Sequence, residues 1–363
     1  MGRTPKNNSD TVESKLSELD KYLKQNSEHH FAFDTPIEYV VSSGSLVLDM
    51  EMGGGIRPGV IRSTGITEGG KTSNALAFAR NFQKVNEDKG QVIYVKAEGR
   101  LSKDMIARSG INTDPSKFRV VPTNDFEFVI DMIRNLTKHN PDDKLYMFII
   151  DSLDSLVPRN DIEKSAIEAE KTAGGALLTS TFLRKMANYF TCKGHICLLI
   201  SQVRSKIQIN PYVKGDPKVT NASGGNAALH YSDWILEFQE RYQKDIIFDE
   251  DKNPIGHWCK IFFRKTPNEK TGIEVRYPIK YGRTNGNSIW VEYEIIEQLK
   301  AWELIEVKGA WINISEPLHA ELTEAGFTVD KLIQGQEKLR KVLENDAKLT
   351  EYLFDKFIKI YKR

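Results

Sequence analysis

The residue types and spacing of residues 65–72 suit the binding of phosphate. The segment reads Gly-Ile-Thr-Glu-Gly-Gly-Lys-Thr, which fits the pattern G-x-x-x-x-G-K-[S/T], and it lies between a predicted strand and a predicted helix. Glycines let backbone N–H groups approach a phosphate closely, and the start of the helix adds a favourable dipole. Lys71 would reach the outer phosphates, and the Thr72 hydroxyl would bind Mg²⁺. The segment predicts a nucleotide-binding loop with contacts from Gly65, Ile66, Thr67, Glu68, Gly69, Gly70, Lys71, Thr72 and Ser73.

Three further polar residues come at or just after the ends of apolar runs that are short enough to be buried strands. These residues are Glu98, Asp151 and Gln202. Open α/β sheets bind their ligands at the carboxyl ends of the strands, so we expect the three side chains near the loop. Asp151 would orient Mg²⁺ through water, Glu98 would activate an attacking water, and Gln202 would sense the terminal phosphate. A helix N-cap for Asp151 and a surface turn for Glu98 are the ordinary alternatives.

A long segment with Gly, Pro and Asn, residues 203–228, follows Gln202 directly. Loops of this length in compact domains are usually functional or disordered. The segment is locally basic and ends in glycines that could present N–H groups to a phosphate, which suits a DNA backbone. A solvated surface loop explains the lysines equally well. The residues concerned are Arg204, Lys206, Lys214 and Lys218, and then Gly224, Gly225 and Asn226.

The elements needed to position these residues alternate along the chain. An amphipathic helix over 14–25 and a short extended run at 38–41 suggest an arm. Strands alternating with helices then predict an α/β fold with a largely parallel central sheet flanked by helices, and with a small α+β domain at the C-terminus. We expect division into residues 1–43, 44–288 and 289–363. Strands are predicted at 60–64, 92–95, 119–121, 145–150, 196–201, 234–238, 259–264, 273–281, 305–307 and 311–314, and late helices at 329–345 and 349–361.

Composition limits the protein's class more than its partners. The chain has 363 residues and a net charge of +1, so no global charge indicates a nucleic-acid partner. Three cysteines without C-x-x-C spacing argue against a disulfide framework. No apolar run approaches the roughly 18 residues of a membrane span, and no signal core is present, so we expect a soluble, intracellular protein without a membrane partner.

Several motifs in one order resemble the RecA family of DNA recombinases. Residues 44–49 (Gly-Ser-Leu-Val-Leu-Asp) resemble the family's entry to the core, residues 65–72 its phosphate loop, and Glu98 its catalytic glutamate. Further counterparts are Ile150-Asp151-Ser152, the segment 200–204, the segment 224–227, Gly309-Ala310-Trp311 and Gly335-Gln336. The resemblance spans about residues 10 to 350, and so many ordered motifs are far more specific than the phosphate loop alone.

The resemblance implies a RecA-like P-loop ATPase core with an N-terminal polymerisation arm. It implies ATP and Mg²⁺ as cofactors, self-assembly into a helical filament on single-stranded DNA, and pairing and strand exchange with homologous duplex DNA. ATP hydrolysis would be stimulated by DNA. Single-strand-binding and mediator proteins would be further partners. The expected location is the cytoplasm, at the nucleoid, or the host cytoplasm if the chain is phage-encoded.

Individual roles carry over from the resemblance by position. Glu98, Lys71 and Gln202 would be catalytic, together with Lys265 supplied to a neighbouring subunit's ATP. The family's second such lysine falls on Phe263 or on Arg264. Met105 would cover the adenine. Contacts to DNA would come from Ser180, Arg184, Arg204, Lys206, Gly224, Gly225 and Asn226.

The chain departs from the family pattern at several places. Ser102 and Met105 stand where bacterial members have Asp and Tyr, which leaves base selectivity open. The first DNA loop, near 163–175, is acidic, and the C-terminus lacks an acidic tail, as in a phage or mobile-element version. An accessory or mediator ATPase without strand exchange is the main alternative, and a hexameric helicase motor shares the same core.

Overall fold

The computed structural model describes residues 18–25, 37–99, 101–163, 174–202 and 225–361. The chain separates into two compact units, residues 1–36 and residues 37–363. In the first unit the described element is α1 (Glu18–Gln25), which confirms this part of the predicted helix. Within the described residues, no helix is long and apolar enough to cross a membrane.

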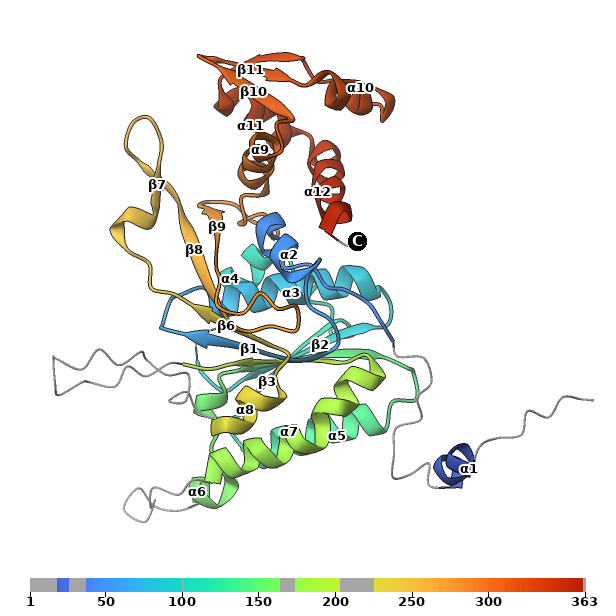
Figure 1. The fold of residues 1–363 in the computed structure, drawn as a ribbon. Helices are drawn as coiled ribbons and strands as arrows, with labels where there is room; N and C mark the ends of the chain where they lie inside the picture. Colours follow the sequence, from blue (N-terminus) through green and yellow to red (C-terminus); the bar gives the residue numbers. More distant parts are fainter. Residues whose placement is uncertain (1–17, 26–36, 100, 164–173, 203–224, 362–363) are drawn as a thin grey trace, which may run out of the picture. The chain divides into compact units, whose positions relative to one another are not determined.

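The second unit is built on a large twisted sheet, which has nine strands among the described residues (Figure 1). Its order is β3-β2-β4-β5-β1-β6-β8-β7, with β9 paired to β8. The pairings from β3 to β6 are parallel, as predicted, and those that involve β8 are antiparallel. The strands are β1 (Gly59–Gly65), β2 (Gly90–Lys96), β3 (Phe118–Pro122), β4 (Leu145–Asp151), β5 (Ile196–Ile200), β6 (Trp234–Phe238), β7 (Ile246–Phe248), β8 (Pro254–Lys265) and β9 (Glu274–Lys280).

Helices cover both faces of the sheet, because side chains along each parallel strand alternate between two apolar cores. Met147 and Ile149 of β4 face the core that contains Phe78, whereas Phe148 and Ile150 face the other core. Figure 1 shows α3 and α4 on one side and α5, α7 and α8 on the other. The helices are α2 (Leu46–Met52), α3 (Lys71–Asn86), α4 (Lys103–Ser109), α5 (Phe126–Lys138), α6 (Arg159–Glu163), α7 (Gly174–Lys193) and α8 (Gly225–Tyr231), with the 3₁₀ turns η1 (Leu153–Ser155) and η3 (Gln243–Asp245).

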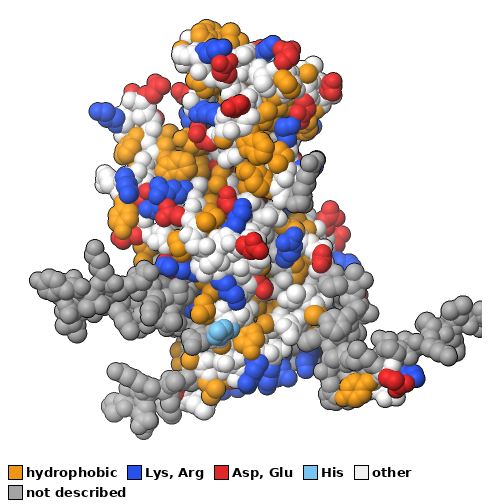
Figure 2. Space-filling view, viewed as in Figure 1, with side chains coloured by type: hydrophobic (Ala, Val, Ile, Leu, Met, Phe, Trp, Pro, Cys, Tyr) orange, Lys and Arg blue, Asp and Glu red, His pale blue; other side chains and the backbone are white. Residues whose placement is uncertain are grey.

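The C-terminal region packs helices against a small antiparallel sheet in a third core, to which Leu46 and Met50 of α2 also contribute. On the face in Figure 2, acidic and basic side chains are interspersed over this region, as expected for a near-neutral chain. The elements are α9 (Val291–Ala301), β10 (Ile305–Lys308), β11 (Trp311–Ile314), α10 (Glu316–Glu324), β12 (Leu332–Gln334), α11 (Gln336–Asn345) and α12 (Ala347–Tyr361).

Two predicted elements were wrong. The helix expected over 329–345 begins only at Gln336, because Ile333 is buried as part of β12 and Gly335, at φ 81°, separates strand from helix. The extended run at 38–41 forms no strand. Val41 instead makes an isolated bridge to Ile56, with reciprocal backbone hydrogen bonds of 2.8 and 2.9 Å.

Candidate nucleotide site

The phosphate loop connects the end of β1 to the start of α3, as its sequence context predicts. Gly65 has φ 136°, and a Cβ there would lie 2.3 Å from the carbonyl oxygen of Phe238. Gly70 has φ 104° and stands immediately before the first residue of α3. Both positions therefore require glycine, one for the close approach of backbone and both for their dihedral angles. The backbone concavity that results is of the kind that binds phosphate.

Lys71 and Thr72 begin α3, and their side chains contact different elements, the loop itself and the end of β4. The buried Lys71 Nζ donates to the carbonyl oxygens of Gly65 (2.9 Å) and Ile66 (2.5 Å). The Thr72 hydroxyl donates to Asp151 Oδ2 at 2.9 Å. A buried ammonium at the loop and a hydroxyl beside a carboxylate are suited to phosphate and to Mg²⁺, which prefers oxygen ligands.

Asp151 ends β4 at the same edge of the sheet. Its Oδ2 also accepts a hydrogen bond from Tyr94 of β2. Burial raises the pKa of Asp151, and the hydrogen bonds from Tyr94 and Thr72 only partly offset this effect. A divalent cation would favour the ionised form of such a carboxylate, so Asp151 and Thr72 fit a Mg²⁺ site. Among the described residues there is no group of three or more His, Cys, Asp or Glu side chains that could hold a metal ion.

Glu98 lies just beyond β2 and is held by three donors on one oxygen. Its Oε1 accepts hydrogen bonds from Gln202 Nε2 (3.0 Å), Ser152 Oγ (2.5 Å) and Ser155 Oγ (2.9 Å). Hydrogen bonds to a carboxylate favour its ionised form and fix its orientation. A fixed, ionised carboxylate is what a general base for water requires.

Lys71, Thr72, Glu98, Asp151 and Gln202 line one cavity of about 450 Å³, which is large enough for a nucleotide's phosphates and sugar, whereas Gly65 and Ile66 do not line it. Leu101 and Met105 form its apolar end. Ser102 does not line it, because its hydroxyl caps α4 by accepting from Met105 N at 3.1 Å. The lining residues are Thr67, Glu68, Gly69, Gly70, Lys71, Thr72, Ser73, Glu98, Leu101, Met105, Asp151, Ser152, Ile200 and Gln202.

A second cavity of about 460 Å³ adjoins the first and shares Gly70, Ser73 and Met105 with it. Tyr277 and Tyr281 contribute aromatic surface, and its charged lining residues are the basic Arg108, Arg241, Lys280 and Arg283. The shared wall allows one nucleotide to extend from the phosphate loop into this aromatic, basic space.

The predicted DNA contacts are only partly described. Ser180 and Arg184 lie on α7, with Ser180 half-buried and Arg184 exposed. Gly225 is the first residue of α8, so the glycine-rich segment ends in a helix start as expected, and Asn226 is the second residue of that helix. Arg204, Lys206 and Gly224 lie outside the described residues, as does most of the acidic first loop.

The positions predicted to act on a neighbouring subunit are engaged within this chain. Lys265 Nζ donates to the carbonyl oxygens of Leu229 (3.1 Å) and His230 (2.7 Å), near the C-terminus of α8. Arg264 makes a two-point ion pair with Glu237, at 2.5 and 3.0 Å. Phe263 is fully buried. Of the two alternatives for the second basic position, Arg264 alone therefore offers a cation at the surface of the sheet.

Sequence reasoning missed several residues that shape the site. Tyr94 lies inside a predicted apolar strand, and Ser152, Asp154 and Ser155 follow Asp151 in a stretch that carried no assigned role. Asp154 Oδ2 accepts from the backbone N–H of Gln202 at 2.6 Å. The available signal was a cluster of hydroxyl and carboxylate residues directly after a strand that ends in aspartate.

The fold and the site together define a P-loop protein with a largely parallel central sheet. The RecA N-terminal domain family matches residues 10–279, so the chain belongs to the RecA family. It is similar to Protein RecA of Campylobacter fetus subsp. fetus (strain 82-40), at 26% identity over 355 residues, which cover 96% of this chain and 92% of that relative. Protein RecA of Petrotoga mobilis (strain DSM 10674 / SJ95) is 30% identical over 319 residues, with 86% and 78% covered.

Proposed function

We propose that the protein is an ATP-dependent recombinase that forms filaments on single-stranded DNA and catalyses homologous pairing and strand exchange. The observation that carries the proposal is the 3.0 Å hydrogen bond from Gln202 Nε2 to Glu98. Gln202 immediately precedes the basic segment that the sequence predicts to bind DNA. One contact thus joins the proposed general base to the proposed DNA-binding segment.

In this proposal the loop N–H groups and Lys71 bind the phosphates of ATP. Lys71 Nζ exchanges its contacts with the Gly65 and Ile66 carbonyl oxygens for contacts with phosphate oxygens, which are stronger acceptors for an ammonium group. Thr72 and Asp151 would hold Mg²⁺, Asp151 through water, and the ion would supply positive charge beside the phosphates. Met105, at the wall shared by the two cavities, covers the adenine.

Glu98 then takes a proton from the attacking water. The hydroxyls of Ser152 and Ser155 hold Glu98 in its orientation for this step. Gln202 replaces its contact with Glu98 by one with the terminal phosphate, and this change is passed to the segment that follows it. Because binding free energies are reciprocal, DNA on that segment would in turn favour the ATP-bound arrangement.

The remaining assignments belong to the same proposal. Residues 1–43 form a polymerisation arm, 44–288 the ATPase core and 289–363 a C-terminal domain. Lys265 acts on the ATP of a neighbouring subunit, with Arg264 as its basic neighbour. DNA phosphates are bound through Ser180, Arg184, Arg204, Lys206, Gly224, Gly225 and Asn226. Such a protein would act on DNA in the cytoplasm, with single-strand-binding and mediator proteins as partners.

Steady-state ATP hydrolysis, measured with and without long single-stranded DNA, tests the proposal. Lys71→Ala provides the blank, because it removes the ammonium at the phosphate loop. Strong stimulation by DNA, with filaments visible by electron microscopy, is the expected result, and homologous strand exchange should follow. Hydrolysis indifferent to DNA would reject the coupling and favour an accessory ATPase without strand exchange.

A further inference from the structure

A charged residue, Arg62, occupies the middle of β1, one of the central strands of the sheet. Its side chain is 0% exposed. The strand pairs with β5 on one side and β6 on the other, and its whole length is buried. Removing a guanidinium from water costs several kcal/mol unless it is paired and hydrogen-bonded. A position that breaks the apolar pattern of a buried strand is where a functional constraint is expected.

Arg62 lies on the face of the sheet away from the phosphate-loop helix. Ile61 faces the core that includes α3, whereas Val60 packs in the core that includes Phe182 and Leu183 of α7. Side chains alternate along a strand, so Arg62 shares the face of Val60. Figure 1 shows that this face is covered by α7 and α8. These are the helices that carry Ser180, Arg184 and Gly225.

Two residues that interact with Arg62, Ser201 and Asp154, also hold the backbone of Gln202. Arg62 Nε is 3.3 Å from the hydroxyl of Ser201, the residue before Gln202. Asp154 attracts the guanidinium and also accepts the backbone N–H of Gln202 at 2.6 Å. Burial lowers the pKa of Arg62. The negative charge of Asp154 opposes this effect, because it favours the charged form of the guanidinium.

Gln202 in turn reaches the proposed general base. Its side chain donates to Glu98 Oε1 at 3.0 Å, and Ser152 and Ser155 donate to the same oxygen. Ser152 immediately precedes η1 and Ser155 is its last residue, and the same turn carries Asp154. A continuous network therefore runs from Arg62, through Ser201 and Asp154, to Gln202 and Glu98.

We propose that Arg62 is a positioning residue. It fixes Gln202 from the face of the sheet that α7 and α8 cover, and so couples structural changes on that face to ATP hydrolysis. This proposal rests on the proposed function, because it concerns the same reaction. Arg62 lines neither of the two cavities. It acts by holding Ser201 and the backbone of Gln202, so that a displacement of α7 or α8 against β1 moves Gln202 relative to Glu98.

The test compares three variants with the wild-type protein. Arg62→Met keeps length and removes charge, Arg62→Lys keeps charge, and Asp154→Asn keeps shape and removes the opposing charge. The measurements are kcat and KM for ATP with and without single-stranded DNA, and the melting temperature. Arg62→Met should lower DNA-stimulated kcat about tenfold while KM changes less than about threefold. Arg62→Lys should recover part of the loss.

Lys260→Met is the matched control, because it removes a buried cation elsewhere. Lys260 Nζ pairs with Asp245 Oδ2 at 2.6 Å, with side chains 6% and 3% exposed, and neither residue lines the two cavities. This variant should lower the melting temperature and keep the ratio of DNA-stimulated to DNA-free kcat. If Arg62→Met shows the same result, Arg62 is only structural and the proposal is overturned.

Two further outcomes separate this proposal from the proposed function. If DNA does not stimulate hydrolysis by the wild-type protein, the recombinase function is rejected. The positioning role is then decided by kcat and KM measured without DNA in Arg62→Lys and Asp154→Asn: a lower kcat with little change in KM supports it. If Arg62→Met does not fold, the same two variants carry the test. Asp154→Asn with normal kcat would overturn the network, and a double variant Arg62→Lys/Asp154→Asn should lose no more than the worse single variant.

Discussion

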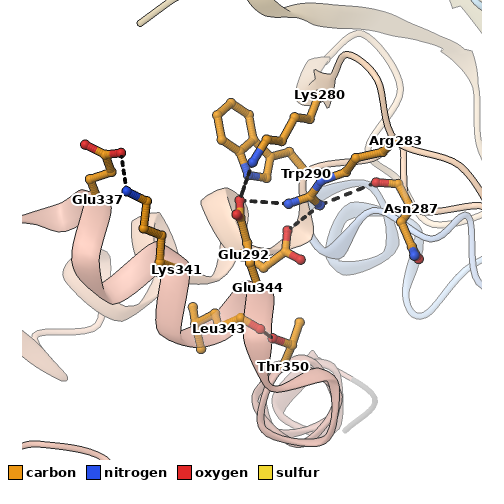
Figure 3. Close-up of polar contacts among 10 residues, drawn as sticks. All are labelled: Lys280, Arg283, Asn287, Trp290, Glu292, Glu337, Lys341, Leu343, Glu344 and Thr350. Carbon is orange, nitrogen blue, oxygen red and sulfur yellow. Dashed lines mark hydrogen bonds and ion pairs between the residues drawn. The ribbon is translucent and has the colours of Figure 1, made fainter. Parts of the chain in front are cut away.

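The nucleotide site and the contact between the core and the C-terminal region hold partly buried carboxylates with different kinds of hydrogen-bond donor. At the site, Glu98 and Asp151 accept hydrogen bonds from neutral groups, which are hydroxyls and an amide. At the C-terminal contact, Glu344 of α11 is held by cations (Figure 3). Its Oε1 lies 2.7 Å from both Lys280 Nζ and an Arg283 nitrogen, and accepts from Trp290 Nε1 at 2.9 Å.

The pKa shifts of the two regions differ in direction for this reason. Burial raises the pKa of Asp151, because neutral donors offset the loss of hydration only in part. Burial acts in the same direction on Glu344, but Lys280, Trp290 and Arg283 outweigh it and hold the pKa below its usual value. Neutral donors can exchange partners when a cation or phosphate binds, whereas an ion pair would lose its partner charge. The hydrogen bonds at the nucleotide site are thus suited to rearrange on ligand binding, whereas the ion pairs at the C-terminal contact are suited to remain in place.

The largest effect on activity is expected at the nucleotide site, when the neutral donors around Glu98 are kept but its negative charge is removed. Glu98→Gln preserves the shape of the site and removes the proposed base, so kcat for ATP should fall by about 10²–10⁴-fold with KM little changed. Filaments on DNA should persist, because binding survives while turnover fails. Lys71→Ala should instead lose nucleotide binding itself, which a fluorescent ATP analogue would measure. Normal turnover in Glu98→Gln would show that the base is another group.

A smaller effect is expected from the backbone that cradles the phosphates. In Gly65→Ala the new Cβ would lie 2.3 Å from the Phe238 carbonyl oxygen at φ 136°, so the loop must shift. We expect a cost of about 1–3 kcal/mol, seen as a lower melting temperature and weaker nucleotide binding. Gly53→Ala is the control, since Gly53 has φ 70° and nothing within 4 Å of its Cβ position. Equal losses in both variants would mean that dihedral strain alone, and not close approach, restricts Gly65.

The same contrast explains what the sequence could predict. Local signals were sufficient for most strands, the phosphate loop and the placement of Asp151, because apolar runs and turn chemistry are properties of neighbouring residues. The short strands β7 and β12 were missed because three residues give no periodicity, and their partners β8 and β11 are needed to define them. Arg62 and Asp154 were missed because their contacts join β1, η1 and the end of β5, which only the folded sheet brings together. Likewise the Glu344 contacts join α11 to the end of β9 and to the turn before α9.

The smallest effect we predict sharpens the contrast from the side of the ion pairs. Glu344→Gln leaves Lys280 without its partner carboxylate, while Arg283 retains Glu292 at 2.8 Å. The expected cost is about 1–3 kcal/mol, measured by chemical denaturation near neutral pH. Glu337→Gln is the control on the same helix. It removes an i,i+4 pair with Lys341 in which both side chains are more than half exposed, so its loss of stability should be much the smaller.

The pH dependence of this loss has a defined sign. A carboxyl whose folded pKa is lowered contributes stability that is present above its unfolded pKa, about 4.3 for Glu, and that is lost as pH falls through the folded value. The difference in stability between wild type and Glu344→Gln should therefore be constant near neutral pH and shrink below about pH 4. A difference that stayed constant into acid would mean that Glu344 contributes through shape and hydrogen bonding. The two regions would then hold their carboxylates in the same way.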